Sequence, residues 1–290
     1  MNTYLWLLRR EFWENRAIWV VPAILGGLLL LTALFGRGDI LVIDTPPRGH
    51  IPGGIFLFAF GAAFFVVMSI YSTWYLLDCL YADRKDRSIL FWKSLPISDT
   101  ATVMSKLITA FIVIPFVYFA AADLTTLLMA FIISVRARGF VGASLWQPDV
   151  WLQLQVMWLY LIVTTAVWFL PFAGWLLTVS AWAKRAVMLW SILPLLALYW
   201  GESWIFGTHV VAGQIGQRLM GYVPLAFHKS PQGEFWVTRA FGSDRDPAGS
   251  VWTLLNPAGF FASPQTWIGV AVGIALILCA IQLRLRRTEI

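Results

Sequence analysis

The chain has almost no charge over most of its length. Five stretches contain no Asp, Glu, Lys or Arg, and a sixth contains only Asp123; they cover residues 18–35, 55–77, 107–135, 151–183, 186–201 and 266–283. About 20 apolar residues of helix cross a bilayer core, and lipid offers no hydrogen-bond partner to an exposed backbone amide. The sequence therefore predicts six membrane-spanning helices.

Charged residues are also scarce in the chain as a whole. They make up 12% of it, hydrophobic residues make up 59%, and the mean hydropathy is +0.74. A soluble domain has about a quarter of its residues charged. The composition excludes such a domain and predicts an all-α polytopic membrane protein with a single transmembrane domain over residues 1–290.

Cysteine is nearly absent. Cys79 and Cys279 are the two in the chain, and both fall near the inner ends of predicted spans, where a reducing cytoplasm disfavours a disulfide. We expect packing roles for both. No small-x-small cleavage site follows the first span, so we expect that span to be retained.

The common catalytic motifs are missing. The chain has no G-x-x-x-x-G-K-[ST] phosphate loop, no G-x-G-x-x-G, no H-E-x-x-H and no G-x-S-x-G. We therefore expect no catalytic residue, no cofactor and no metal on this chain. One alternative stays open, a membrane-embedded enzyme that acts on a lipid or lipid-linked substrate through outside residues such as His209, His228 and Glu234.

The basic residues indicate the orientation. With six spans, 13 of the 21 Lys and Arg residues lie in short segments on the side of the two termini, and eight lie in longer loops on the other side. Positive residues mark the cytoplasmic face. We expect both termini in the cytoplasm, in a multi-pass protein of the plasma membrane (a bacterial inner membrane). The net charge of +6 then reflects contact with membrane lipid, and nucleic acid is not an expected partner.

Two segments outside the spans have apolar residues at helical spacing. In residues 1–16, Leu5, Leu8 and Phe12 predict a short interfacial helix, which either leads into the first span or docks on another subunit. Residues 209–265, on the outer side, contain two apolar stretches too short to span. They predict a re-entrant or interfacial hairpin before the last span.

Asp123 lies inside the third predicted span. A carboxylate within a membrane is costly and by default has a function, such as relaying protons or contacting cargo. The alternative is that Asp123 accepts hydrogen bonds from Thr125, Thr126 or a neighbouring helix and fixes the packing. No second deeply placed charge completes a relay, which favours the packing role.

The connection over residues 83–99 is the most informative one. It begins with a mixed-charge turn, continues with Ile89, Leu90, Phe91, Trp92 and Leu95, and stops at Pro96, which cannot extend a helix. Ser98 can then cap the next helix. A short cytoplasmic helix with exposed Phe and Trp needs an apolar partner, which is either the membrane surface or a groove in another protein.

This connection resembles a segment of a known family. The residues Asp83-Arg84-x-x-Arg87-Ser88-Ile89-x-x-Trp92-x-Ser94-Leu95-Pro96-Ile97-Ser98 are similar to the D/E-R-x-x-G-T/S-L-x-x-L/W-x-S-L-P-V/I-S segment of ABC-2 type transporter permeases, the membrane subunits of many ATP-binding-cassette exporters. Arg87 stands where the family often has glycine. The six spans, interfacial helix and outer hairpin also match the family's plan.

The resemblance implies a function and partners. In the family this segment is the coupling helix that docks on the ATPase, which implies docking roles for a set of residues here: Arg87, Leu90, Phe91, Trp92, Leu95 and Pro96. ATP and Mg would bind a separate ABC ATPase subunit, present in two copies. A second copy of this permease, or a related one, would complete the pathway for an apolar or amphipathic cargo. A non-transporting assembly or sensory subunit is a further alternative.

Overall fold

The computed structural model describes residues 3–36, 53–86, 98–136, 146–208, 210–228 and 251–286, and these residues are helical apart from turns and one isolated β-bridge. The helices are α1 (Thr3–Glu14), α2 (Ala17–Phe35), α3 (Gly53–Lys85), α5 (Asp99–Ile108), the π-helical turn η2 (Thr109–Val113), α6 (Ile114–Arg136), α8 (Pro148–Trp168), α9 (Leu170–Trp182), α10 (Val187–Gly201), the π-helical turn η3 (Glu202–Phe206), α11 (Val210–Met220), α12 (Tyr222–Ala226), α14 (Val251–Leu254), α15 (Pro257–Ala262) and α16 (Pro264–Arg286).

Within the described residues, five helical segments are long and apolar enough to cross a membrane. They are Ala17–Phe35, Leu57–Lys85, Asp99–Arg136, Pro148–Trp168 and Pro264–Arg286. Many of their large apolar side chains, such as Leu28, Phe116 and Ile268, are more than half exposed, as lipid-facing residues are. The expected all-α polytopic membrane fold is thus confirmed at this level.

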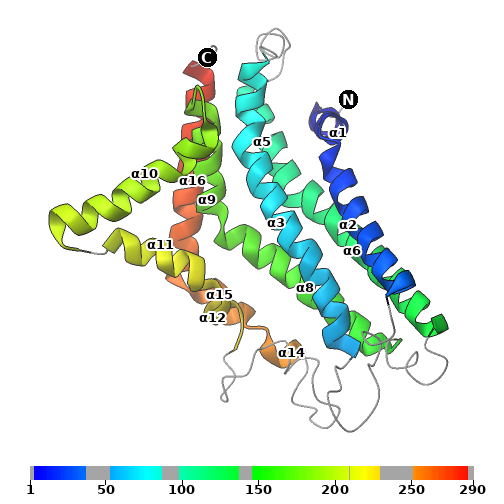
Figure 1. The fold of residues 1–290 in the computed structure, drawn as a ribbon. Helices are drawn as coiled ribbons and strands as arrows, with labels where there is room; N and C mark the ends of the chain where they lie inside the picture. Colours follow the sequence, from blue (N-terminus) through cyan, green and yellow to red (C-terminus); the bar gives the residue numbers. More distant parts are fainter. Residues whose placement is uncertain are drawn as a thin grey trace.

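The fifth predicted span differs from expectation. Residues 186–201 correspond to α10, which η3 continues without a break to Phe206, and this helical run is not among the five segments that are long and apolar enough to span. After η3 the chain turns at Gly207, whose φ of 60° lies in the left-handed region that favours glycine. Figure 1 shows α10 leaving the bundle obliquely and α11 running back toward it. The apolar run therefore forms one arm of a V-shaped hairpin.

The outer hairpin region is built from short helices. Val211, Ile215 and Leu219 fall on α11, as their spacing predicts, and Pro257 opens α15 behind an Asn256 cap that accepts a bond of 2.9 Å from the Gly259 amide. The α12 and α14 ends are joined by the bridge between Phe227 and Leu255. None of these helices, within the described part of the region, is long enough to span.

Close helix crossings hold the bundle together. A Cβ atom added to Gly174 of α9 would lie 2.8 Å from the Gly273 carbonyl oxygen of α16, and one added to Gly26 of α2 would lie 2.6 Å from the Thr125 hydroxyl of α6. Small residues allow membrane helices to approach and gain van der Waals contact where the lipid supplies no hydrophobic drive. At the α9–α16 crossing the added atom would meet backbone, so this approach depends on the glycine itself.

Candidate functional site

The predicted docking residues lie in the part of the chain that the structure leaves undescribed, residues 87–97. This holds for all six: Arg87, Leu90, Phe91, Trp92, Leu95 and Pro96. The two ends of the segment are described, at residues 83–86 and from residue 98 onward. The Ser98 side chain accepts a hydrogen bond of 3.1 Å from the Ala101 amide, so the predicted cap of the next helix is confirmed.

Arg284 near the end of α16 joins both ends of this segment. Its Nη1 lies 3.0 Å from Asp83 Oδ2 on α3, and its Nε lies 2.9 Å from Asp99 Oδ1 at the start of α5. Asp83 and Arg284 are 6% and 3% exposed. One planar guanidinium therefore holds together two carboxylates that are 16 positions apart in the sequence, at the two ends of the segment. The single ammonium of a lysine cannot reproduce this forked geometry.

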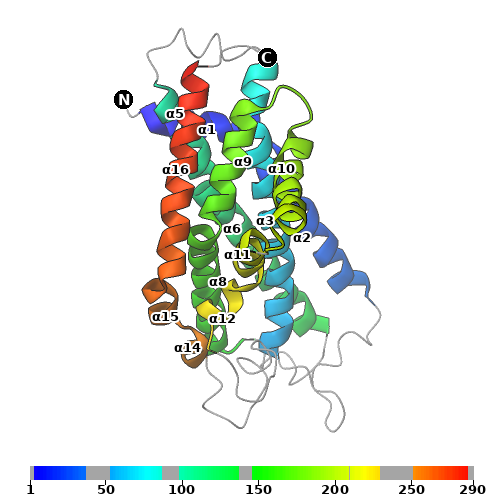
Figure 2. The same ribbon diagram turned by 90° about the vertical axis from the view of Figure 1, so that its left-hand side faces the viewer.

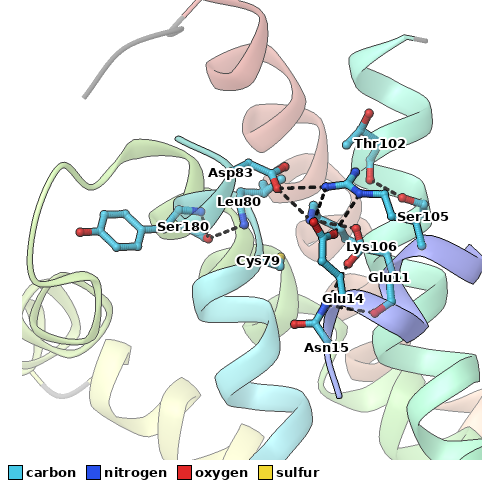
Figure 3. Close-up of polar contacts among 12 residues, drawn as sticks. Glu11, Glu14, Asn15, Cys79, Leu80, Asp83, Thr102, Ser105, Lys106 and Ser180 are labelled. Atoms are coloured by element: carbon cyan, nitrogen blue, oxygen red, sulfur yellow. Dashed lines mark hydrogen bonds and ion pairs between the residues drawn. The ribbon is translucent and has the colours of Figure 1, made fainter. Parts of the chain in front are cut away.

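Lys106 extends this arrangement to the N-terminal helix. Its ammonium lies 3.4 Å from Asp83 Oδ1 and 3.1 Å from Oε1 of Glu11 on α1. The Tyr75 hydroxyl donates to Glu11 Oε2 over 2.7 Å. Figure 3 shows Glu11, Asp83 and Lys106 converging from three helices. We name Glu11, Asp83, Asp99, Lys106 and Arg284 the basal charge cluster.

The basal charge cluster is largely buried, and its charges are paired. Glu11 and Lys106 are 1% and 3% exposed, and Arg10, whose Nε lies 2.9 Å from Glu14 Oε2, is also 3.9 Å from Asp83. Charges removed from water are tolerated only when they are paired and hydrogen-bonded. If one of these helices moved alone, a buried charge would lose its partner. The ion pairs therefore favour movement of α1, α3, α5 and α16 together over movement of one helix alone.

Arg84 ties the segment to a fifth helix. Its Nη2 donates to the carbonyl oxygens of Ser180, at 2.6 Å, and Ala183, at 2.8 Å, at the end of α9. In return the Ser180 hydroxyl accepts bonds of 3.1 Å from the backbone amides of Leu80 and Tyr81. A cation at the carbonyl end of a helix is favourable. Both charged residues that open the family-like pattern, Asp83 and Arg84, are therefore buried contacts between helices.

Sequence reasoning missed this cluster. The basic residues counted there for the orientation include Arg84, Lys106 and Arg284, and no partner was predicted for them or for Asp99. The available signal was weak: both charge signs occur at the same predicted end of several spans, where pairing is possible. Nothing in the sequence assigns Glu11 to Lys106, which lies 95 positions away.

Asp123 is held by a neighbouring helix. Nε2 of Gln155 on α8 donates to Asp123 Oδ1 over 2.8 Å. Thr126 donates instead to the Ala122 carbonyl oxygen within its own helix. The contact with Gln155 agrees with the packing role, and the donor is a residue that the sequence analysis had not named.

Most residues of the enzyme alternative lie outside the part of the chain that the structure describes. His209 and Glu234 lie outside the described residues, and the described His228 is exposed on the chain after α12. Among the described residues no group of three or more His, Cys, Asp or Glu side chains could hold a metal ion. Cys79 is buried and Cys279 is exposed, both as free thiols.

The chain was also compared with known proteins. No family model, no curated protein and no solved structure matches it. The functional argument therefore depends on the residues and contacts described above.

Proposed function

We propose that the chain is the membrane-spanning permease subunit of an ABC exporter, with ATP hydrolysed on a separate ATPase subunit. One observation carries the proposal: the basal charge cluster joins both ends of the family-like segment, at Asp83 and Asp99, to α1 and α16. A solvated surface loop does not need buried ion pairs to anchor its two ends. A segment that receives force from a partner needs such an anchor, because the force must reach the membrane helices.

The mechanism follows from these contacts. Closure of two ATPase subunits around ATP would displace the docked residues 87–97. Asp83 passes the movement to Lys106 and Arg284, and Arg84 passes it to the end of α9. Packed helices switch between discrete arrangements more readily than they deform. The bundle would then alternate between an inward and an outward form, and its pairing with a second permease copy would complete the route.

The proposed topology has six crossings with both termini in the cytoplasm of a bacterial inner membrane. Figures 1 and 2 show α1 and the end of α16 at the same end of the bundle, with α14 and α15 at the other. An even number of crossings follows from this arrangement. Beside the five long helices, the path through α10, α11 and α12 supplies the remaining crossing in broken form, which lipid tolerates where neighbouring protein satisfies the backbone.

The proposal is tested at the docking segment with Leu95→Glu. We expect the purified wild-type chain to show no ATP turnover alone, and to stimulate turnover when its ATPase is added. Burial of an apolar side chain such as Leu95 contributes about 1.5–3 kcal/mol, so its loss weakens docking on the ATPase by roughly tenfold or more. The carboxylate introduced by Leu95→Glu weakens docking further, because it would be buried in an apolar contact.

The measurements are ATPase co-purification and ATP turnover, normalised to membrane abundance. Ser94→Glu, one position away and polar already, is the matched control and should retain its ATPase. If Leu95→Glu inserts normally and keeps both its ATPase and its activity, the segment lies on the membrane surface and the permease proposal fails.

A further inference from the structure

A large apolar cavity lies between the bundle and the α10 arm of the hairpin. It has a volume of about 740 Å³ and is lined by residues of α3, η2, α6, α8, α9, α10, α11 and α12. Ligand pockets commonly have volumes of about 300–1,000 Å³. Its inner wall includes the buried residues Met68, Leu76, Ala110 and Ala173. The cavity is thus large enough for a small molecule.

The mouth of the cavity opens on an apolar outer face of the molecule. Four lining residues are also strongly exposed: Ile70 at 65% and Trp74 at 58% on α3, and Met188 at 56% and Ile192 at 47% on α10. They lie on helices whose outer faces are apolar, so the medium at the mouth is hydrocarbon. In the proposed topology this part of α3 and α10 belongs to the cytoplasmic half of the membrane, which gives access from the inner leaflet.

The lining defines the chemistry of a ligand. No Asp, Glu, Lys, Arg or His is among the described lining residues, so the cavity offers no counter-charge to an ion. The hydroxyls of Ser69, Thr73, Thr165 and Ser191 each donate to a protein oxygen, over 2.8, 2.8, 3.1 and 2.7 Å. The hydroxyl of Ser72 has no partner in the described part of the chain and is buried in the cavity wall, so it reaches a ligand by rotation of its side chain about χ1.

We propose that this cavity binds the acyl chain and ester group of a membrane amphiphile that enters sideways between α3 and α10, the ester carbonyl accepting a hydrogen bond from Ser72. Such an amphiphile is then the cargo, an assignment that rests on the proposed permease function. An acyl chain fits apolar walls open to lipid, and an ester carbonyl supplies the acceptor that Ser72 lacks. A charged headgroup stays outside the cavity, at the mouth or beyond it.

The test uses the whole chain, without the ATPase, in nanodiscs of phosphatidylethanolamine and phosphatidylglycerol. The probe is a monoacylglycerol with a diazirine in its acyl chain, and photolabelled peptides are mapped by mass spectrometry. We expect saturable labelling of cavity residues on α3 and α10, above the labelling of Leu28 and Leu31 on α2, which are 57% and 49% exposed. Equal labelling of all lipid-facing helices would overturn the proposal.

Matched serine variants test the polar contact. Ser72→Ala removes a hydroxyl with no protein partner, so we expect unchanged or higher thermal stability and a roughly two- to tenfold weaker affinity for the probe. The control Ser105→Ala, on α5 and outside the lining, removes a hydroxyl that already donates to the Thr102 carbonyl oxygen. Its affinity for the probe should equal that of the wild type.

A cavity-filling variant, Ala166→Phe, tests the site as a whole. We expect it to abolish the saturable labelling, and wild-type labelling in both Ala166→Phe and Ser72→Ala would refute the site. Stimulation of the ATPase is measured in parallel. If the wild type shows saturable labelling but does not stimulate the ATPase, the permease function is contradicted and the cavity assignment stands. If it stimulates the ATPase but shows no saturable labelling, the cavity assignment alone is contradicted.

Discussion

At the residue scale, Lys106 has the central position in the basal charge cluster, since its ammonium contacts carboxylates of both α1 and α3. We expect Lys106→Met to destabilise the folded protein by about 3–5 kcal/mol, because Glu11 and Asp83 would keep buried charges without their shared cation. Lys85→Met, at an exposed position at the end of α3, is the control and should change little.

The measurement is thermal unfolding of the purified chain in one detergent. The double variant Glu11→Gln with Lys106→Met should be less destabilised than the sum of the two single variants, since it removes charge of both signs. Additive losses would show that Glu11 and Lys106 are not coupled.

Arg284 allows a test of transmission that is separate from docking. Arg284→Lys keeps the charge, but one ammonium cannot form the fork that reaches both Asp83 and Asp99. We expect the ATPase to co-purify normally while its stimulation falls by about fivefold or more, the scale of a typical coupling energy. The control is Arg286→Lys, exposed in the same helical turn. Full stimulation in Arg284→Lys would mean that the cluster only stabilises the fold.

The cluster also marks the limit of sequence reasoning about single residues. The Ser98 cap could be predicted because it is a local pattern of a few residues. The pairs that join Glu11 to Lys106 and Asp83 to Arg284 depend on how helices from distant parts of the chain are arranged. One sequence carries no information on that arrangement beyond the charge of each residue.

At the scale of elements, the α9–α16 crossing depends on the absence of side chains. Gly174→Ala would place a Cβ atom 2.8 Å from the backbone oxygen of Gly273, which cannot move aside easily. We expect a loss of about 1–3 kcal/mol, as for other overpacked sites. Gly27→Ala on α2, where nothing lies within 4 Å of the added Cβ, should keep or raise stability because alanine favours a helix.

Thermal unfolding in detergent, followed by circular dichroism, distinguishes the two glycine variants. Equal melting temperatures for Gly174→Ala and the wild type would show that α9 and α16 are less closely packed than described.

Long elements were predictable and the hairpin arm was not. The five described helices that are long and apolar enough to span follow from uninterrupted apolar runs, a property of sequence and length alone. Residues 186–201 are equally apolar, yet they form an arm of 15 residues beside the cavity. Glu202 and Gly207 directly after the run were the available signals, because a charge and a left-handed glycine oppose continuation of a spanning helix.

At the scale of the whole molecule, the orientation can be tested with reporter fusions. The basic residues put the segment after α3 and the C-terminus in the cytoplasm, so fusions at Ser94 and Ile290 should report the cytoplasm. Fusions at Pro47 and Asp246 should report the outside. The fusion at Asp246 is decisive, because the crossing through α10, α11 and α12 is not made by one of the five long apolar helices. If the hairpin were only an inner-side excursion, Asp246 would report the cytoplasm, five crossings would separate the termini, and the proposed permease topology would be wrong.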